Sequence, residues 1–451
     1  MKKFIYFFSY FIAFRPFDDG KNELSALLLS NNIYKDSVDI TLSSCTDIES
    51  GRYFLCKIFS FFYSQNQFIN QSFILFISLL IYTLSIIFLY KILRTFQQED
   101  ASLISVLIII SLHRFNFLFA NYPLLQTSPS STQIGNLFLL ATIFYILKRK
   151  FKISFILFIS LFLIHSTIAT LFFIPLCFIT IYKYRDLKVR LSVFFDGINK
   201  NNFLLYFLIF FLMIVFINLR FFLLSFEDLE LSSIYYLRHL YHFPATEILK
   251  SLLIILITIF SNIYLINFKV FKKFSNLILI FFLYFFILGL TSLFIVEDSN
   301  ILIQLLAPQR AFAIFSVIII SFTCSTIINN KNTFYLNLRK LILIFYLSIS
   351  VVTFFQYYVQ SLNEFISFNN DIKLIPERYK SIKDIHSENE EMYFYLGKGI
   401  TKSSIFPFNM KDMKSFGRNR SSSSPIFEIK NQNYSKDYEC LYKTKYFCIT
   451  E

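Results

Sequence analysis

Long apolar segments dominate this sequence and constrain its fold more than any other feature. The first runs from 4 to 14, and a polar stretch then continues to about residue 67. Nine further segments follow, near 68–90, 102–120, 136–147, 153–182, 203–224, 250–267, 276–296, 311–328 and 341–359. A helix that crosses a bilayer needs about 20 mostly apolar residues. The pattern therefore predicts an all-α polytopic membrane protein.

Composition and charge support this class and argue against the alternatives. Hydrophobic residues make up 55% of the chain and charged residues 16%, whereas a soluble domain carries about 25% charged residues. The formal charge of +14 sits in short clusters between apolar segments, which is typical of membrane orientation rather than of nucleic-acid binding. We therefore expect no nucleic-acid partner. The six cysteines include no C-x-x-C pair, so we also expect no metal motif.

The first apolar segment resembles a signal peptide because it follows Lys2 and Lys3. No small-residue cleavage site comes after it, and the chain continues directly into Arg15 and Pro16. We therefore expect this segment to remain as a short first crossing, with the two lysines at one membrane interface and Arg15 at the other.

The segment 153–182 decides the topology, because it can form one long tilted helix or two short crossings that meet at His165, Ser166 and Thr167. Two crossings place 19 Lys and Arg in the connections on one side and seven in those on the other. One crossing would mix the two sides. The positive-inside rule therefore favours two crossings, about 11 transmembrane helices and a cytoplasmic N-terminus.

The predicted bundle covers residues 1–360, with a long external loop at 15–67, and the rest of the chain, 361–451, reads as an external, partly ordered tail. Within the tail, M-Y-F-Y-L and P-I-F-E-I-K are typical of short strands. If the external face is oxidising, Cys45 with Cys56 and Cys440 with Cys448 are candidate disulfides. Cys177 and Cys324 lie in apolar segments and are expected to remain thiols.

Ionisable residues at the edges of the apolar segments gather on the predicted external side. The candidates for a functional site are Asp18, Asp19, Arg114, His165, Arg220 and Arg310. Charged groups in a membrane are costly and often mark a site, although arginines near a helix end also snorkel to the interface without further function. The acidic pair, likewise, can be a solvated turn before Gly20.

The chemistry of this set suits proton acceptance by the carboxylates and the holding of a phosphate by the guanidinium and imidazole groups. A guanidinium group makes two parallel bonds to a phosphate and stays ionised when half buried. Two adjacent carboxylates at a membrane edge can accept a proton from a hydroxyl nucleophile or hold a divalent cation, so the cofactor stays open.

The layout resembles the polyprenyl-phosphate-sugar-dependent glycosyltransferases of the GT-C type. The likeness rests on F-R-P-F-D-D-G-K-N-E from Phe14 to Glu23 after a short first helix, and on K-R-K-F-K and I-H-S-T between 148 and 167. The resemblance implies that Asp18 or Asp19 activates the acceptor hydroxyl. It also implies that Arg114, Arg220 or Arg310, with His165, holds the lipid phosphate of the donor.

These observations together predict a glycosyltransferase in the cell membrane (plasma or inner). It would take sugar from a lipid-linked donor on the external face, for the cell envelope. Two alternatives remain. A polysaccharide polymerase or ligase would share these features and differ in its acceptor, whereas a flippase or transporter for lipid-linked sugars should show related halves, and no internal repeat is evident.

Overall fold

The computed structural model describes most of the predicted bundle and part of the tail. It covers 52–62, 67–114, 119–185 except 123 and 126–129, 243–296 except 269–270, and 304 and 306–329. It also describes residues 337, 340, 341, 344 and 348, which are helical, and four strands between 393 and 450. The predicted crossings at 4–14 and 203–224 lie outside the described residues.

Helices account for the described part of the bundle, and eight longer ones coincide with predicted apolar segments or their halves. They are α5 (Gln67–Arg94), α6 (Glu99–Arg114), α7 (Ser131–Leu147), α8 (Phe151–Ile164), α9 (Ser166–Arg185), α13 (Ile248–Asn267), α14 (Ser275–Leu293) and α16 (Pro308–Ile328). Shorter elements are α4 (Arg52–Phe61), η1 (Phe119–Asn121), η3 (Pro244–Glu247) and η4 (Lys272–Phe274).

The segment 153–182 forms two helices, as the charge pattern predicts. Helix α8 ends at Ile164 and α9 begins at Ser166, with His165 between them in a non-helical conformation (φ −149°, ψ 78°). The rings of Phe158 and Phe173 stack with their centroids 6.0 Å apart. A continuous helix would separate these residues by about 22 Å, so the chain folds back at His165.

The described helices run in two opposite directions, which gives the bundle two distinct ends. At one end Gln97, before α6, contacts Thr326 near the end of α16. At the other end Phe119, after α6, packs on Phe312 near the start of α16. Helices α6 and α16 are therefore antiparallel. We call the end that contains His165 and the start of α16 the hinge end.

The opposite end carries most of the described cations, and we call it the lysine end. Its basic residues include Lys91, Arg94, Lys148, Arg149, Lys150, Lys152 and Lys272. The Lys91 ammonium lies 5.5 Å from the ring centroid of Phe144, so α5 and α7 both finish here. The ring of Phe96 packs on Phe274 at 5.7 Å, which places the beginning of α14 at the same end.

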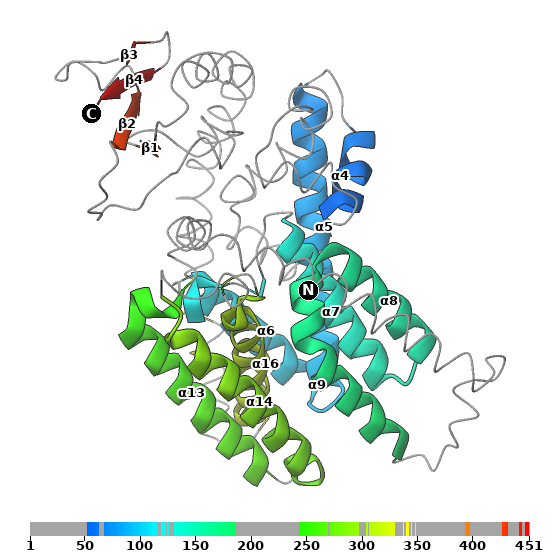
Figure 1. Cartoon of the computed structure of the whole chain (residues 1–451). Helices are drawn as coiled ribbons and strands as arrows, with labels where there is room; N and C mark the ends of the chain where they lie inside the picture. The colour runs from blue at the N-terminus through cyan, green and yellow to red at the C-terminus, as the bar shows by residue number, and fades with distance from the viewer. Residues whose placement is uncertain are drawn as a thin grey trace, which may run out of the picture.

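Figure 1 shows two groups of helices, with α7, α8 and α9 on one side and α13, α14 and α16 on the other. Aromatic rings join the groups: Phe172 of α9 packs on Phe285 of α14 at 5.0 Å, and Phe285 stacks on Phe315 of α16 at 4.5 Å. Gly289 lets α14 approach closely, because a Cβ there would lie 2.7 Å from the ring of Phe312. This packing fixes the first turns of α16 against α9.

Four described helical segments are long and apolar enough to cross a membrane. They are Phe76–Arg94, Pro244–Asn267, Ser275–Leu293 and Pro308–Ile328. Helices α13 and α14 expose rows of large apolar side chains, among them Leu253, Phe260 and Leu283. In water such faces would be costly to expose, whereas lipid chains satisfy them. These four candidate spans agree with the polytopic membrane class expected from the sequence, while the total of about 11 crossings stays a prediction.

The described part of the tail forms a four-stranded sheet with the order β1-β2-β4-β3. The strands are β1 (Tyr393–Leu396), β2 (Ile426–Asn431), β3 (Tyr442–Lys443) and β4 (Phe447–Thr450). Strand β1 pairs with β2 in parallel, while the other two pairings are antiparallel. β1 and β2 lie in the two segments whose sequences are typical of strands.

Candidate anion-binding site

The break at His165 places an imidazole at the hinge end. His165 closes α8, because its backbone N–H donates to the carbonyl of Leu161 at 2.7 Å. The same residue precedes the first turn of α9, and its Nδ1 lies 3.4 Å from the backbone nitrogen of Ile168. This is the position of an N-cap side chain, which satisfies one of the free N–H groups at a helix start.

The start of α16 brings Arg310 to the same place. Ala307 has a left-handed conformation (φ 47°) that turns the chain sharply, and Pro308 then occupies the first helical turn. The N–H of Arg310 donates to the carbonyl of Ala307 at 2.9 Å. Pro is favoured at this position because its ring presets a helical φ and it has no N–H to leave unsatisfied. The turn therefore holds the Arg310 side chain at the beginning of the helix, where it is half-buried.

A third helix start completes the site. Ser130 caps α7, with its hydroxyl accepting from the backbone N–H of Gln133 at 3.3 Å. In the first turn of α7 the hydroxyl of Thr132 lies 3.2 Å from Nε2 of His165. One turn later, Gly135 faces the same histidine, and a Cβ at Gly135 would stand 2.9 Å from the His165 Cβ. Helix α7 thus packs directly against the break between α8 and α9.

His165 and Arg310 meet although 145 residues separate them in the chain. Nη1 of Arg310 lies 3.3 Å from Nε2 of His165. The guanidinium carbon of Arg310 is 5.6 Å from the centroid of the Tyr122 ring, a cation–π distance. Tyr122 itself is buried just after η1. His165 at the start of α9 and Tyr122 after η1 therefore flank the guanidinium group of Arg310, and Thr132 at the start of α7 contacts the same histidine.

The electrostatics of this centre favour an anion. A helix start carries the equivalent of about half a positive charge on its free N–H groups, and the starts of α7, α9 and α16 meet here. The guanidinium adds a full charge that does not titrate near neutral pH. A guanidinium fork beside helix starts suits the oxygen atoms of a phosphate or carboxylate.

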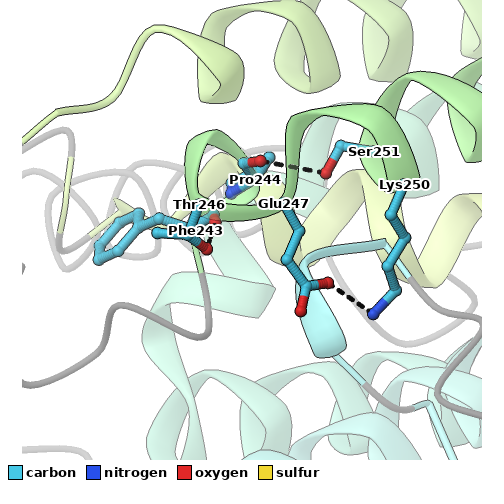
Figure 2. A network of polar contacts seen from close by, with 6 residues as sticks. All are labelled: Phe243, Pro244, Thr246, Glu247, Lys250 and Ser251. Carbon is cyan, nitrogen blue, oxygen red and sulfur yellow. Dashed lines mark hydrogen bonds and ion pairs between the residues drawn. The ribbon is translucent and has the colours of Figure 1, made fainter.

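The start of α13 supplies a second polar region at the hinge end. Figure 2 shows Ser251 donating to the carbonyl of Pro244 at 3.2 Å and Thr246 donating to that of Phe243 at 2.8 Å. Lys250 forms an ion pair of 2.7 Å with Glu247. These bonds are local to η3 and the first turn of α13. Lys250 pairs with the neighbouring Glu247 of η3, and it serves as a second cation at the same end for comparison with Arg310.

The site lies at the level where apolar helices end. Helices α5 and α7 run in parallel, with the Phe88 and Phe144 rings 5.8 Å apart. The same number of residues separates Phe144 from Ser131 in α7 and Phe88 from Leu75 in α5, so Ser131 and Leu75 lie at the same level of the bundle. The candidate span of α5 begins at Phe76, next to Leu75. The spans Pro244–Asn267 and Pro308–Ile328 also begin at the hinge end. The centre therefore sits at the boundary between apolar helix surface and the polar loops.

The other candidates from the sequence are only partly within the described residues. Arg114 is the last residue of α6, so its backbone lies at the hinge end, and its side chain is not among those described. Asp18, Asp19 and Arg220 lie outside the described residues. Cys177 and Cys324 are free thiols, as expected, whereas both candidate disulfides include a cysteine outside the described residues.

The structure adds two contact residues that the sequence did not single out, Tyr122 and Thr132. Thr132 had a signal, because S-P-S-S-T before an apolar run is typical of a capped helix start. No sequence pattern pointed to Tyr122, since its role depends on a partner in a distant helix. In the part of the chain that the structure describes, no three His, Cys, Asp or Glu side chains gather as a metal site.

Comparisons do not supply an identity for this site. The chain matches no known family model, no curated protein and no solved structure.

Proposed function

We propose that the protein is an integral membrane glycosyltransferase that takes a sugar from a polyprenyl-phosphate-linked donor, with Arg310 and His165 holding the donor phosphate. The observation that supports this proposal most is the 3.3 Å approach of Arg310 to His165. Both residues are candidates for phosphate binding from the sequence alone. Their meeting at three helix starts gives that role a physical basis.

The depth of the centre suits a lipid-linked phosphate. Such a donor keeps its hydrocarbon chain among apolar side chains while its phosphate and sugar reach the polar boundary. At the hinge end the apolar span of α16 begins at Pro308, two residues before Arg310. A phosphate bound by Arg310 would thus lie at the edge of the apolar zone, where weak hydration strengthens its attraction to the guanidinium.

In this proposal the reaction is an in-line displacement at the anomeric carbon of the donor. The acceptor oxygen forms the new bond as the bond to the phosphate oxygen breaks, and the lipid phosphate leaves with the bonding electron pair. Arg310 and the helix starts stabilise the negative charge that develops on this leaving group. Asp18 or Asp19 would accept the proton of the acceptor hydroxyl. A divalent cation at the two aspartates is compatible with this scheme.

The charge asymmetry of the bundle supports a sidedness for the proposal. Short cytoplasmic connections are enriched in Lys and Arg, so the lysine end would face the cytoplasm, and the hinge end would face outside. The N-terminus would then be cytoplasmic, while the tail and the site would be external. The enzyme would act in the plasma or inner membrane, with membrane lipids and the lipid-linked donor as its partners.

The test is sugar transfer by the full chain in proteoliposomes supplied with polyprenyl-phosphate-linked sugars. Arg310→Gln should weaken use of the donor about tenfold to a hundredfold, because a neutral amide cannot balance the phosphate charge. Lys250→Gln removes the same charge at the same end and should leave transfer unchanged. Movement of the lipid-linked sugar across the bilayer without any sugar transfer would show that the protein is a flippase and not a glycosyltransferase.

A further inference from the structure

The short helix α4 exposes large apolar side chains. Those of Ile58 and Phe61 are 58% and 83% exposed, and that of Phe62, directly after the helix, is 48% exposed. Phe59 on the same helix is buried. Helix α4 therefore has one face packed on the protein and another, apolar face that the fold leaves exposed.

Aromatic rings hold α4 on the first turns of α5. The ring of Phe73 in α5 stacks on Phe62 with the centroids 4.8 Å apart, and it lies 6.0 Å from the ring of Phe59. Figure 1 shows α4 beside the beginning of α5. Helix α4 also contacts α8, which ends one residue before His165. The position of α4 is therefore set by two helices of the bundle.

Phe73 belongs to the same face of α5 as three exposed apolar residues. Ile69, Phe76 and Leu80 are exposed, and their spacings of seven and four residues put them on one face of the helix. Phe73 lies four residues after Ile69 and three before Phe76. Within the candidate span Phe76–Arg94 this face meets lipid. Helix α4 thus packs on the lipid-facing side of α5.

The depth of this contact matches the membrane interface. Phe73 precedes the start of the span at Phe76 by three residues, or about 4.5 Å along a helix. The headgroup region on each side of the hydrocarbon core is about 5–7 Å thick. With 10 residues, α4 is too short to cross the bilayer. A short helix with an exposed apolar face at this level meets lipid headgroups and the first carbons of the chains.

We propose that α4 is an interfacial anchor, whose exposed face of Ile58, Phe61 and Phe62 is embedded in the lipid surface at the hinge end. Bilayer lipid is the partner, because this face continues the lipid-facing row of α5 at headgroup depth. The anchor holds the end of the predicted external loop 15–67 at the level of the hinge. The inference requires that the bundle spans a membrane, and it does not depend on the proposed sugar transfer.

The test uses a single introduced tryptophan, because the chain contains none. The full chain with Phe61→Trp is placed in phosphatidylcholine nanodiscs, and the lipids are brominated either just below the headgroup or near the chain ends. Bromine quenches tryptophan emission only at short range. Leu256→Trp is the reference for deep lipid, since Leu256 is exposed midway along the span Pro244–Asn267. Phe59→Trp, on the buried face of α4, is the matched control.

The expected result is a shallow lipid position for the exposed face alone. Phe61→Trp should be quenched several-fold more by bromine below the headgroup than by bromine near the chain ends, and Leu256→Trp should show the reverse. Phe59→Trp should be quenched less than Phe61→Trp by both lipids. Ile58→Trp repeats the measurement on the same face if Phe61→Trp does not fold.

Three results would overturn the proposal. Emission at long wavelength, quenched by iodide and by neither lipid, would place the exposed face of α4 in water. Emission at short wavelength without any quenching would show that another segment of the chain or a second copy covers it. Stronger quenching near the chain ends would place α4 inside the bilayer core. None of these results would affect the proposed phosphate site, whose test is the binding and transfer of the donor.

Discussion

The two ends of the helical bundle use charge in opposite ways. At the lysine end the cations are numerous and mostly exposed, and the described ion pair, Arg94 with Glu99 at 3.1 Å, lies near the surface. At the hinge end Arg310 is half-buried among His165, Thr132 and Tyr122. The number of charges orients a membrane protein, whereas the partial burial of Arg310 is the basis of the proposed binding site. The following experiments test that contrast.

Sidedness should give an all-or-none result. Ser166→Cys, beside the hinge, should react with a membrane-impermeant maleimide added from outside, and Lys150→Cys only in inverted vesicles. Labelling of the wild-type chain gives the background from the native cysteines. Labelling of Ser166→Cys from the cytoplasmic side alone would reverse the assignment of the two ends.

The acidic pair should have the largest effect on catalysis. Replacing Asp18 and Asp19 by Asn removes the proposed proton acceptor while preserving size, so transfer should fall by roughly two to four orders of magnitude. Binding of geranylgeranyl phosphate at Arg310 should persist, because the phosphate site is separate from the base. Full transfer by the double variant in proteoliposomes would refute the catalytic role.

Two glycines distinguish the site from the core of the same end. In Gly135→Ala the new Cβ would press on His165, so transfer should fall about tenfold to a hundredfold through misplacement of the ring. In Gly289→Ala the Cβ would meet the Phe312 ring at 2.7 Å and should cost about 1–3 kcal/mol of stability. Transfer assays and thermal unfolding in detergent should therefore rank the two variants in opposite orders. Identical rankings would mean that His165 has no special role.

The lysine end should show a structural effect without a catalytic one. Gln97 donates to Thr326 at 2.9 Å and accepts from Asn329 at 3.1 Å, which joins the turn before α6 to the end of α16. Gln97→Ala should lower the free energy of unfolding by about 1–3 kcal/mol with little change in kcat/KM for transfer. The neighbouring, exposed Gln98 is the control. If kcat/KM for transfer fell by more than the loss of stability explains, the lysine end would be coupled to the site.

Hydropathy and charge predict the helices well because both act locally along the chain. The charge alternation finds the break at His165, which hydropathy alone would miss. The predicted helix 102–120 is too long, since α6 ends at Arg114 and Ala120 has a positive φ of 52°. Phe119 is buried in the core without extending α6, so an apolar run alone overestimates the helix.

The contacts of the site are harder to predict than its members. His165 and Arg310 are unusual residues at helix ends, which is why the sequence singles them out. Their meeting depends on the packing of α7, α9 and α16, and no local pattern encodes a contact across 145 residues. The roles of Tyr122 and Gly135 likewise depend on their contacts with Arg310 and His165.

The most direct test of the account is the affinity of the purified full chain for geranylgeranyl phosphate in nanodiscs. We predict that Arg310→Gln weakens binding about tenfold to a hundredfold, while Lys250→Gln, with the same loss of charge at the same end, binds as the wild type does. The weakening should diminish at high salt, because screening reduces the electrostatic contribution. Equal affinities for the wild type and Arg310→Gln would show that the hinge end is not a phosphate site and would contradict the central claim.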